Sequence, residues 1–183
     1  MNLDYKFIEV SRLSNSDKHQ LQLLQIKLFP KFKKMYKKSG WYSYIKPNYV
    51  LNVYDRDTIV GTGKVIIRKA KVNNGHLSIL AFGVLVDTSY QKKGIASKMI
   101  NLFSGMAADK GVDCIFCTTE SEVLARMLIT KNFKNIHNPV SFLNSQSNEI
   151  EFVKEGTAYV RRLTNRSDMI VSGTKIFLGE GPL

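Results

Sequence analysis

The stretch from Leu80 to Ala96 reads LAFGVLVDTSYQKKGIA, and it decides which fold this chain can adopt. Its first part, Leu80 to Val86, is a short run of apolar residues and glycine that predicts a buried strand. Asp87 to Tyr90 predicts a polar turn, and Gln91 to Ala96 leads into a helix. The chain therefore passes from a strand to a helix through a loop that carries lysine and glycine.

The loop between this strand and this helix has the chemistry of a phosphate site. Backbone N–H groups at the start of a helix lack partners within the helix, and the helix dipole attracts anions to that end. Gly94 and Ala96 are small enough to let a phosphate approach the backbone, while Lys92 and Lys93 add positive charge. Glycine in such a loop also serves tight turning alone, so the motif by itself leaves both interpretations open.

Composition limits the class of protein. The 183 residues suffice for one domain with a substantial core, and 44% hydrophobic and 23% charged residues are ordinary for a globular protein. No apolar run reaches the ~18 residues that span a bilayer, and the first residues lack a signal core, so we expect a cytoplasmic protein without a membrane segment. The net charge of +12 suits an acidic partner or ligand, such as a polyphosphate cofactor, nucleic acid or an acidic protein.

The N-terminal part predicts a strand and a helix. Lys6 to Val10 is a short apolar run, and Ser14 to Asp17 offers residues that cap the start of a helix. Pro30 is expected to end or kink that helix. From Lys27 to Lys38 the chain mixes lysines with aromatic residues. This run predicts an amphipathic helix with solvated lysines, and the alternative is a docking surface for an anionic partner.

Two hairpins are expected before the quoted stretch. Tyr49 to Ala70 has the pattern of two strands joined by a polar turn, and Asn73 to Gly75 is a strong signal for a second hairpin turn. Gly61 and Gly63 in the second strand predict a bulge or a close approach of another backbone.

The residues after the quoted stretch predict a right-handed βαβ unit. Ser97 to Lys110 has a helical apolar face, Gly111 is a candidate C-terminal cap, and Val112 to Thr118 predicts a buried strand parallel to the first. Ser121 to Lys131 predicts another helix. Weakly alternating segments beyond it predict further strands at Phe133–Ile136, Val140–Leu143, Glu151–Val153, Thr157–Leu163 and Met169–Leu178.

The two cysteines, Cys114 and Cys117, form a C-x-x-C motif. On a strand, residues three apart point to opposite faces, so these thiols cannot form a disulfide or share a metal ion. We expect both to be buried structural residues, although Cys117 at the strand end is a conceivable nucleophile.

The order of elements and the loop residues resemble the GNAT superfamily of acyltransferases. Gln91, Gly94 and Ala96 occupy the defined positions of its Q/R-x-x-G-x-G/A motif. NFKNI, which begins at Asn132, resembles the family's GF-containing segment, with asparagine where glycine is usual. VIIRKAKVNNGHLSILAFGVLV and the closing SGTKIFLGEGPL resemble parts of the nodulation acyltransferases, and PVSFL with EGTAYV resembles parts of the aminoglycoside 2′-N-acetyltransferases. Both of these relatives modify an amino sugar.

The resemblance implies an α/β (α+β) fold. Its sheet would be mixed and mostly antiparallel with a central parallel strand pair, and helices would flank both faces. We expect one domain over residues 1–183, with its core in 49–136 and the C-terminal strands in 137–183.

The resemblance also implies that acetyl-CoA, or another acyl-CoA, is the donor and that no metal ion takes part. The backbone of Val84, Leu85 and Val86 would bind the pantetheine arm in the manner of an added strand. The pyrophosphate would be held by the residues of the loop and the first turn of the helix, namely Gln91, Lys92, Lys93, Gly94, Ile95, Ala96 and Ser97.

Catalysis in such an enzyme is direct attack of a neutral amine on the thioester, so a base must remove a proton from the ammonium. The related aminoglycoside enzymes carry a glutamate where this chain has Phe82, and many GNAT enzymes have a tyrosine acid where it has Leu128. Glu120 is our candidate base, and its other interpretation is a favourable carboxylate near a helix start. Phe82 and Trp41, in the aromatic loop from Gly40 to Asn48, are the candidate substrate-binding residues, and the loop could equally plug the core.

Three functions follow. The first is a CoA-dependent N-acyltransferase that acts on a small amine, such as an amino sugar or aminoglycoside, although +12 does not favour a cationic antibiotic. The second uses the basic run of residues 27–38 to recognise an acyl carrier protein as donor, or an RNA-linked or protein acceptor. The third is a catalytically inactive module that binds CoA. The acceptor, the acyl length and the oligomeric state are not encoded in these patterns.

Overall fold

The computed structural model describes residues 2–39, 45–144, 147–171 and 173–181. Its contacts divide the chain into two compact units, one of residues 1–65 with 83–102 and the other of residues 66–82 with 103–183. Two long strands, β3 and β4, each belong partly to both units. The expectation of a single domain therefore stays a prediction.

The first unit contains an antiparallel set of strands. β1 (Leu3–Glu9) pairs with β2 (Tyr49–Asp55), which pairs in turn with the first part of β3 (Thr58–Val72). β1 lies earlier than the apolar run at Lys6–Val10 predicts, because pairing with β2 begins at Leu3 and a 3₁₀ turn starts at Val10.

A bulge and a close contact mark the first part of β3. Val53 pairs with Gly61 and Tyr54 with Ile59, so Val60 is the extra residue in the ladder. A Cβ added at Gly61 would lie 3.3 Å from the carbonyl oxygen of Leu85. This position therefore confirms both the bulge and the close backbone approach that the glycines predict.

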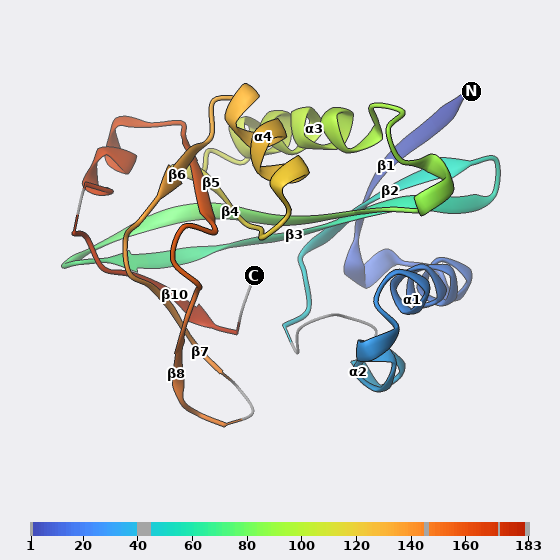
Figure 1. Ribbon diagram of the computed structural model, residues 1–183, viewed down its shortest axis with the longest axis horizontal. Helices are drawn as coiled ribbons and strands as arrows, with labels where there is room; N and C mark the ends of the chain where they lie inside the picture. The colour runs from blue at the N-terminus through green and yellow to red at the C-terminus, as the bar shows by residue number, and fades with distance from the viewer. Residues whose placement is uncertain (1, 40–44, 145–146, 172, 182–183) are drawn as a thin grey trace. The chain divides into compact units, whose positions relative to one another are not determined.

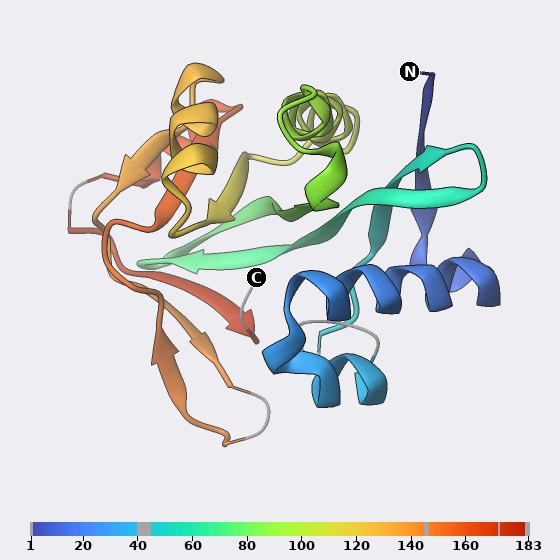
Figure 2. The same cartoon turned by 45° about the vertical axis from the view of Figure 1, so that its right-hand side comes forward.

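Two helices of the first unit lie side by side (Figures 1 and 2). α1 (Asn15–Leu28) begins after Ser14, whose hydroxyl accepts a hydrogen bond from the Asp17 N–H at 3.0 Å. It ends before Pro30, as predicted, and a 3₁₀ turn then leads into α2 (Lys33–Ser39). The single helix expected from Lys27 to Lys38 is therefore wrong. The apolar side of α1 packs on the strands through Val10, Leu13, Leu21, Leu24, Val50 and Ile59.

β3 and β4 (Gly75–Val86) form the predicted hairpin. Its turn consists of Asn73 and Asn74, and Asn73 has a φ of 50°. α3 (Ile95–Asp109) follows β4, and Gly111, with a φ of 60°, turns the chain into β5 (Cys114–Thr118). β5 is parallel to β4, which confirms the βαβ unit.

The second unit completes the sheet with short strands. α4 (Glu122–Thr130) precedes these short strands. The order of hydrogen-bonded strands is β6–β9–β5–β4 in one part of the sheet and β3–β10–β7–β8 in the other. β7 and β8 form a hairpin next to β10 (Figure 1). β10 and β7 are a second parallel pair, whereas most other pairings are antiparallel. The bounds are β6 Lys134–Ile136, β7 Val140–Leu143, β8 Ile150–Phe152, β9 Ala158–Arg162 and β10 Ile176–Glu180. The predicted mixed α/β sheet flanked by helices is confirmed.

The strand expected at Met169–Leu178 is mostly wrong. Residues Asn165–Met169 form a 3₁₀ helix, and β10 starts only at Ile176. The Thr174 hydroxyl donates to the Met169 carbonyl and accepts from the Val171 N–H, both at 3.2 Å. These local bonds close a turn where alternation alone suggests a strand.

A buried carboxylate ties three segments of the second unit together. Asp113 precedes β5 and is 4% exposed. One of its oxygens accepts the Ser78 N–H of β4 at 2.8 Å, and the other accepts the Thr164 hydroxyl at 2.9 Å. The Arg166 guanidinium lies 3.8 Å away.

Removal of this carboxylate should destabilise the fold. Asp113→Ala leaves a half-buried N–H without its acceptor, which costs about 1–3 kcal/mol of the free energy of unfolding. Urea denaturation of this variant beside Asp109→Ala, which removes an exposed carboxylate at the end of α3, measures the difference. Equal losses in the two variants would contradict the role given to Asp113.

Candidate functional site

The end of β4 leads into the loop on which the predicted phosphate site depends. Val84 to Val86 are half-buried, and Gly83 before them is exposed. These residues follow the segment Ile79–Ala81, which pairs with β5. The Asp87 N–H donates to the Val60 carbonyl at 2.9 Å, which keeps the end of β4 against β3.

Side-chain hydrogen bonds hold the turn after β4. The Asp87 carboxylate accepts from both the N–H and the hydroxyl of Ser89, at 3.1 and 2.7 Å. The Tyr90 hydroxyl donates to the Asp55 carboxylate at 2.6 Å, which anchors the turn to the end of β2. The Gln91 side-chain amide donates to the Val86 carbonyl at 3.1 Å. Gln91 therefore stabilises the loop by linking it to the end of β4.

The next residues present a row of backbone donors. Among the residues that the structure describes, none accepts a hydrogen bond from the backbone N–H groups of Lys92 to Ser97. Lys92 has a φ of 59° and Gly94 a φ of 77°, and such alternation turns successive N–H groups toward one concave side. A Cβ at Gly94 would meet nothing within 4 Å, so the space above the loop is open.

This loop fits a phosphate group. Its donors lie at the start of a helix of 15 residues, where the dipole adds positive potential. Lys92, Lys93 and Lys98 are exposed around it. Two of these lysines are positioned by aromatic rings, with the Lys93 ammonium 4.8 Å from the Tyr90 ring centre and the Lys98 ammonium 4.0 Å from that of Tyr5.

An ion pair joins α1 to this loop. The Lys27 ammonium lies 2.7 Å from the Asp87 carboxylate, whose side chain is only 14% exposed. The hydrogen bond from Lys27, with further bonds from Ser89, lowers the pKa of Asp87 to about 2. One lysine of the basic run therefore has an intramolecular partner and helps to place the phosphate loop.

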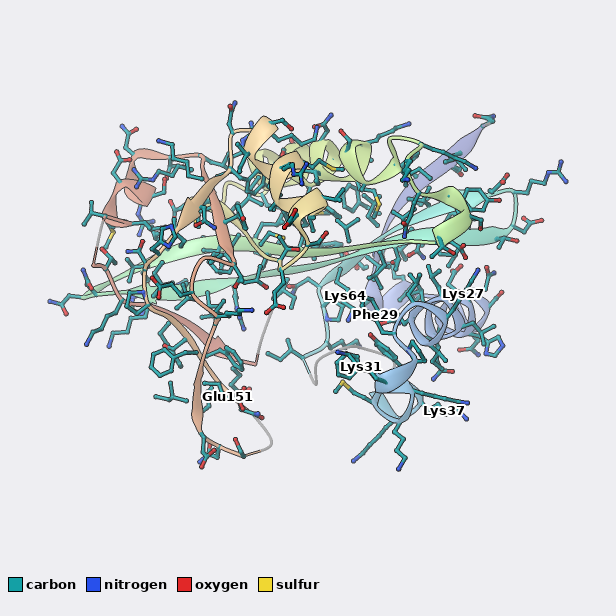
Figure 3. All side chains as sticks on the ribbon, viewed as in Figure 1. Lys27, Phe29, Lys31, Lys37, Lys64 and Glu151 are labelled. Carbon is teal, nitrogen blue, oxygen red and sulfur yellow. The ribbon has the colours of Figure 1, made fainter. Side chains whose placement is uncertain are left out.

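Lys64 on β3 is a residue that the sequence analysis missed. Burial lowers the pKa of Lys64 to about 7, from 10.5. It lies on the face of the strands against which α1 packs, and Figure 3 labels it below the β3 ribbon. The sequence feature that could have identified it is a lysine within the largely apolar strand TIVGTGKVII.

The predicted catalytic and substrate residues occupy different environments. The Glu120 side chain is 69% exposed, precedes the Ser121 cap of α4, and lies 3.3 Å from the Lys154 ammonium. Phe82 is buried and stacks on Phe103 with ring centres 4.9 Å apart, so its ring is part of a packed core. Trp41 lies outside the described residues. The catalytic role of Glu120 and the substrate contacts of Phe82 and Trp41 stay predictions.

The two cysteines are buried free thiols, as expected. Burial raises the pKa of Cys117 to about 12, and that of Cys114 likewise to about 12. At neutral pH neither thiol forms the thiolate that nucleophilic attack requires.

Comparison with known proteins places this geometry in a family. The model described as the Acetyltransferase (GNAT) family matches residues 18–128, which is more than half of the chain. That range contains most of α1, both hairpins, the phosphate loop, α3 and β5. No curated protein matches the chain.

Solved structures with the same fold include three bacterial proteins. The Escherichia coli protein ElaA has a TM-score of 0.62 at 12% identity over 88% of this chain and 100% of its own. The GNAT family N-acetyltransferase YhbS from Escherichia coli, solved in complex with CoA, has a TM-score of 0.61 at 12% identity over 97% and 91%. A GNAT family acetyltransferase from Staphylococcus aureus MU50 has a TM-score of 0.56 at 16% identity over 88% and 100%. The fold and the family match agree, and this chain is an acyltransferase that belongs to the acetyltransferase (GNAT) family.

Proposed function

We propose that this protein transfers an acyl group from acyl-CoA to the primary amine of a small molecule. The observation that carries the proposal is the open row of backbone donors from Lys92 to Ser97 at the start of α3. A diphosphate is the ligand that such a row binds best, because it brings several anionic oxygens to adjacent N–H groups. CoA carries a diphosphate next to its pantetheine arm.

Each residue of the proposed donor site has a distinct part. The N–H groups of Lys92, Lys93, Gly94, Ile95, Ala96 and Ser97 bind the pyrophosphate, and the two lysines add charge. Gln91 acts through its bond to the Val86 carbonyl and keeps the loop in shape.

The strand before the loop takes the pantetheine arm. The pairing of Asp87 with Val60 directs alternate N–H and C=O groups of β4 toward β3. The backbone groups of Val84 and the N–H of Val86 therefore face away from β3 and can extend hydrogen bonds to the amide groups of the ligand, while the Val86 carbonyl accepts from Gln91. An N–H on this strand also stabilises the thioester oxygen as it becomes negative.

The chemical step is direct attack. The neutral acceptor amine attacks the thioester carbon, the C–S bond breaks, and CoA leaves as the thiol, with no acyl-enzyme. An acyl-enzyme through cysteine is disfavoured because both thiols are buried and protonated. Amino sugars are the first acceptor class to test, since the two narrower resemblances share that chemistry.

Acceptor chemistry can be tested by thiol release. We expect purified protein with acetyl-CoA to release CoA thiol in the presence of at least one member of a panel of amino sugars, aminoglycosides, polyamines and peptides. A matched reaction with each acceptor N-acetylated in advance should release none. Retention of CoA with no release for any amine would contradict acyl transfer to amines and favour the inactive CoA-binding module.

A carrier-protein donor is the second candidate, and the basic run favours it. Lys31, Lys33, Lys34, Lys37 and Lys38 are exposed, and residues 27–38 contain no acidic side chain. An acyl carrier protein is acidic and ends in the same phosphopantetheine arm. Release from an acyl-carrier thioester but not from acyl-CoA would select this candidate over free CoA.

The phosphate loop can be tested by one substitution. Gly94→Glu places a carboxylate above the donors, where repulsion of the pyrophosphate should weaken CoA binding by about 100-fold or more. The open space at this glycine accommodates the side chain, although its φ of 77° adds local strain. Isothermal titration with CoA measures the loss.

Gly105→Glu is the matched control for this substitution. It introduces the same side chain into α3 at an exposed glycine whose Cβ position is also open. It should bind CoA as the wild type does. Unchanged CoA affinity in folded Gly94→Glu would refute the placement of the pyrophosphate.

A further inference from the structure

The register of the β3–β4 hairpin places Lys64 directly opposite Gly83. The two-residue turn pairs Val72 with Gly75, and the bond from the Asp87 N–H to the Val60 carbonyl has the same register at the other end of the hairpin. Counting residues along both strands from either of these pairs gives Gly83 as the partner of Lys64. Gly83 immediately precedes Val84, the first residue of the proposed pantetheine strand.

The Lys64 side chain lies on the face of the strands that α1 covers. Lys64 pairs with Val50 on β2, and directly opposed residues of an antiparallel pair share a face. Val50 packs in one cluster with Leu21 and Leu24 of α1. Lys64 therefore lies on the face of the strands against which α1 packs, and it is half-buried.

Gly83 leaves room beside this lysine. It is exposed, and a Cβ added there would meet nothing within 4 Å. The position across from Lys64 therefore has no side chain and an open approach to the β4 backbone. An acceptor amine that reaches the end of the pantetheine arm can occupy this space.

The surroundings keep this lysine uncharged over part of the physiological pH range. Desolvation is the cause that lowers the pKa of Lys64 to about 7, so about half of the molecules carry a neutral amine at that pH. Tyr54 lies on the same face of β2, and burial raises its pKa to about 12, so its hydroxyl is neutral. The titratable side chains of α1, the 3₁₀ turn at Pro30–Phe32 and α2 are Asp17, Lys18, His19, Lys27, Lys31, Lys33, Lys34, Tyr36, Lys37 and Lys38.

Two of these charges already have partners. Asp17 accepts a hydrogen bond from the Tyr54 hydroxyl at 2.9 Å, and Lys27 pairs with Asp87. A neutral lysine next to the cofactor strand is a competent base, because its conjugate acid is close in strength to the operating pH.

We propose that Lys64 is the general base that accepts a proton from the acceptor ammonium, directly or through one water molecule. This inference rests on the proposed function. The ammonium R–NH₃⁺ gives one proton to the Lys64 amine and becomes R–NH₂, which attacks the thioester carbon. As the C–S bond breaks, a second proton passes from the acceptor nitrogen to the CoA sulfur. The amide keeps the third hydrogen, and Lys64 returns its proton to solvent.

The first test does not depend on activity. In protein labelled with ¹³C at the lysine ε-carbon, the Lys64 signal is assigned by its loss in Lys64→Arg and is followed from pH 5 to 11. We expect a midpoint near pH 7. A midpoint at the ordinary lysine value of about 10.4 would overturn the proposal.

The second test is kinetic and uses the amine found by thiol release. With acetyl-CoA, kcat of the wild type should rise with pH through about 7, because the neutral base is the active form. Lys64→Met and Lys64→Arg should lower kcat by about 100-fold or more and abolish the break near pH 7. Lys69→Met, at an exposed lysine of the same strand, is the control and should keep both the rate and the break.

The outcomes separate this proposal from the proposed function. An active wild type whose Lys64 variants keep the rate and pH profile would overturn the role of Lys64 alone. No thiol release by the wild type with any amine would overturn acyl transfer to amines. CoA affinity should be unchanged in Lys64→Met, since the proposed pyrophosphate donors are backbone groups of Lys92 to Ser97. A loss of CoA binding equal to the loss of kcat would assign Lys64 a structural role.

Discussion

The register of β3 against β4 is the constraint on which the candidate site depends. A two-residue turn at Asn73 and Asn74 sets it, and the bond between Asp87 and Val60 closes it at the far end. A slip of one residue would move every side chain of β4 to the opposite face. The register therefore determines which backbone groups of β4 face away from β3, toward the proposed acyl donor, and which residue of β3 lies opposite Gly83.

The anion site follows from the end of that hairpin. β4 stops at Val86, and the turn that follows is held by bonds from Ser89, Tyr90 and Lys27. These bonds order the chain before α3, so the N–H groups at the start of α3 stay directed at one open space. The charge of +12 acts in the same direction, since it draws polyanions to a surface that already holds donors for them.

The catalytic residues are less evident than the donor site, and the physical reason is local. Glu120 follows the end of β5 in solvent, where its carboxylate lies 3.3 Å from the Lys154 ammonium. Lys64 has the opposite setting, because burial on β3 lowers the pKa of its ammonium to about 7. In the proposed mechanism, a desolvated lysine on β3 takes the role that the resemblance assigns to a glutamate at the position of Phe82.

Local patterns determined much of this protein. The strand, loop and helix from Leu80 to Ala96, the Ser14 cap, the stop at Pro30 and the Asn73–Gly75 turn all depend on residues close in the chain. For that reason their positions and the donor loop could be predicted. The strand expected at Met169–Leu178 failed because Thr174 forms local bonds that alternation does not reveal.

Only the tertiary structure decided the rest. The parallel pairing of β10 with β7, the engagement of Lys27 by Asp87 and the burial of Lys64 each join residues distant in the chain. The packing of Phe82 on Phe103 likewise joins distant residues, while its substrate contact stays a prediction. Spacing along a sequence specifies periodicity and turns, but the pKa of a side chain depends on which distant segments exclude water from it. In the sequence Lys64 is an ordinary strand lysine, and its burial is evident only in the folded structure.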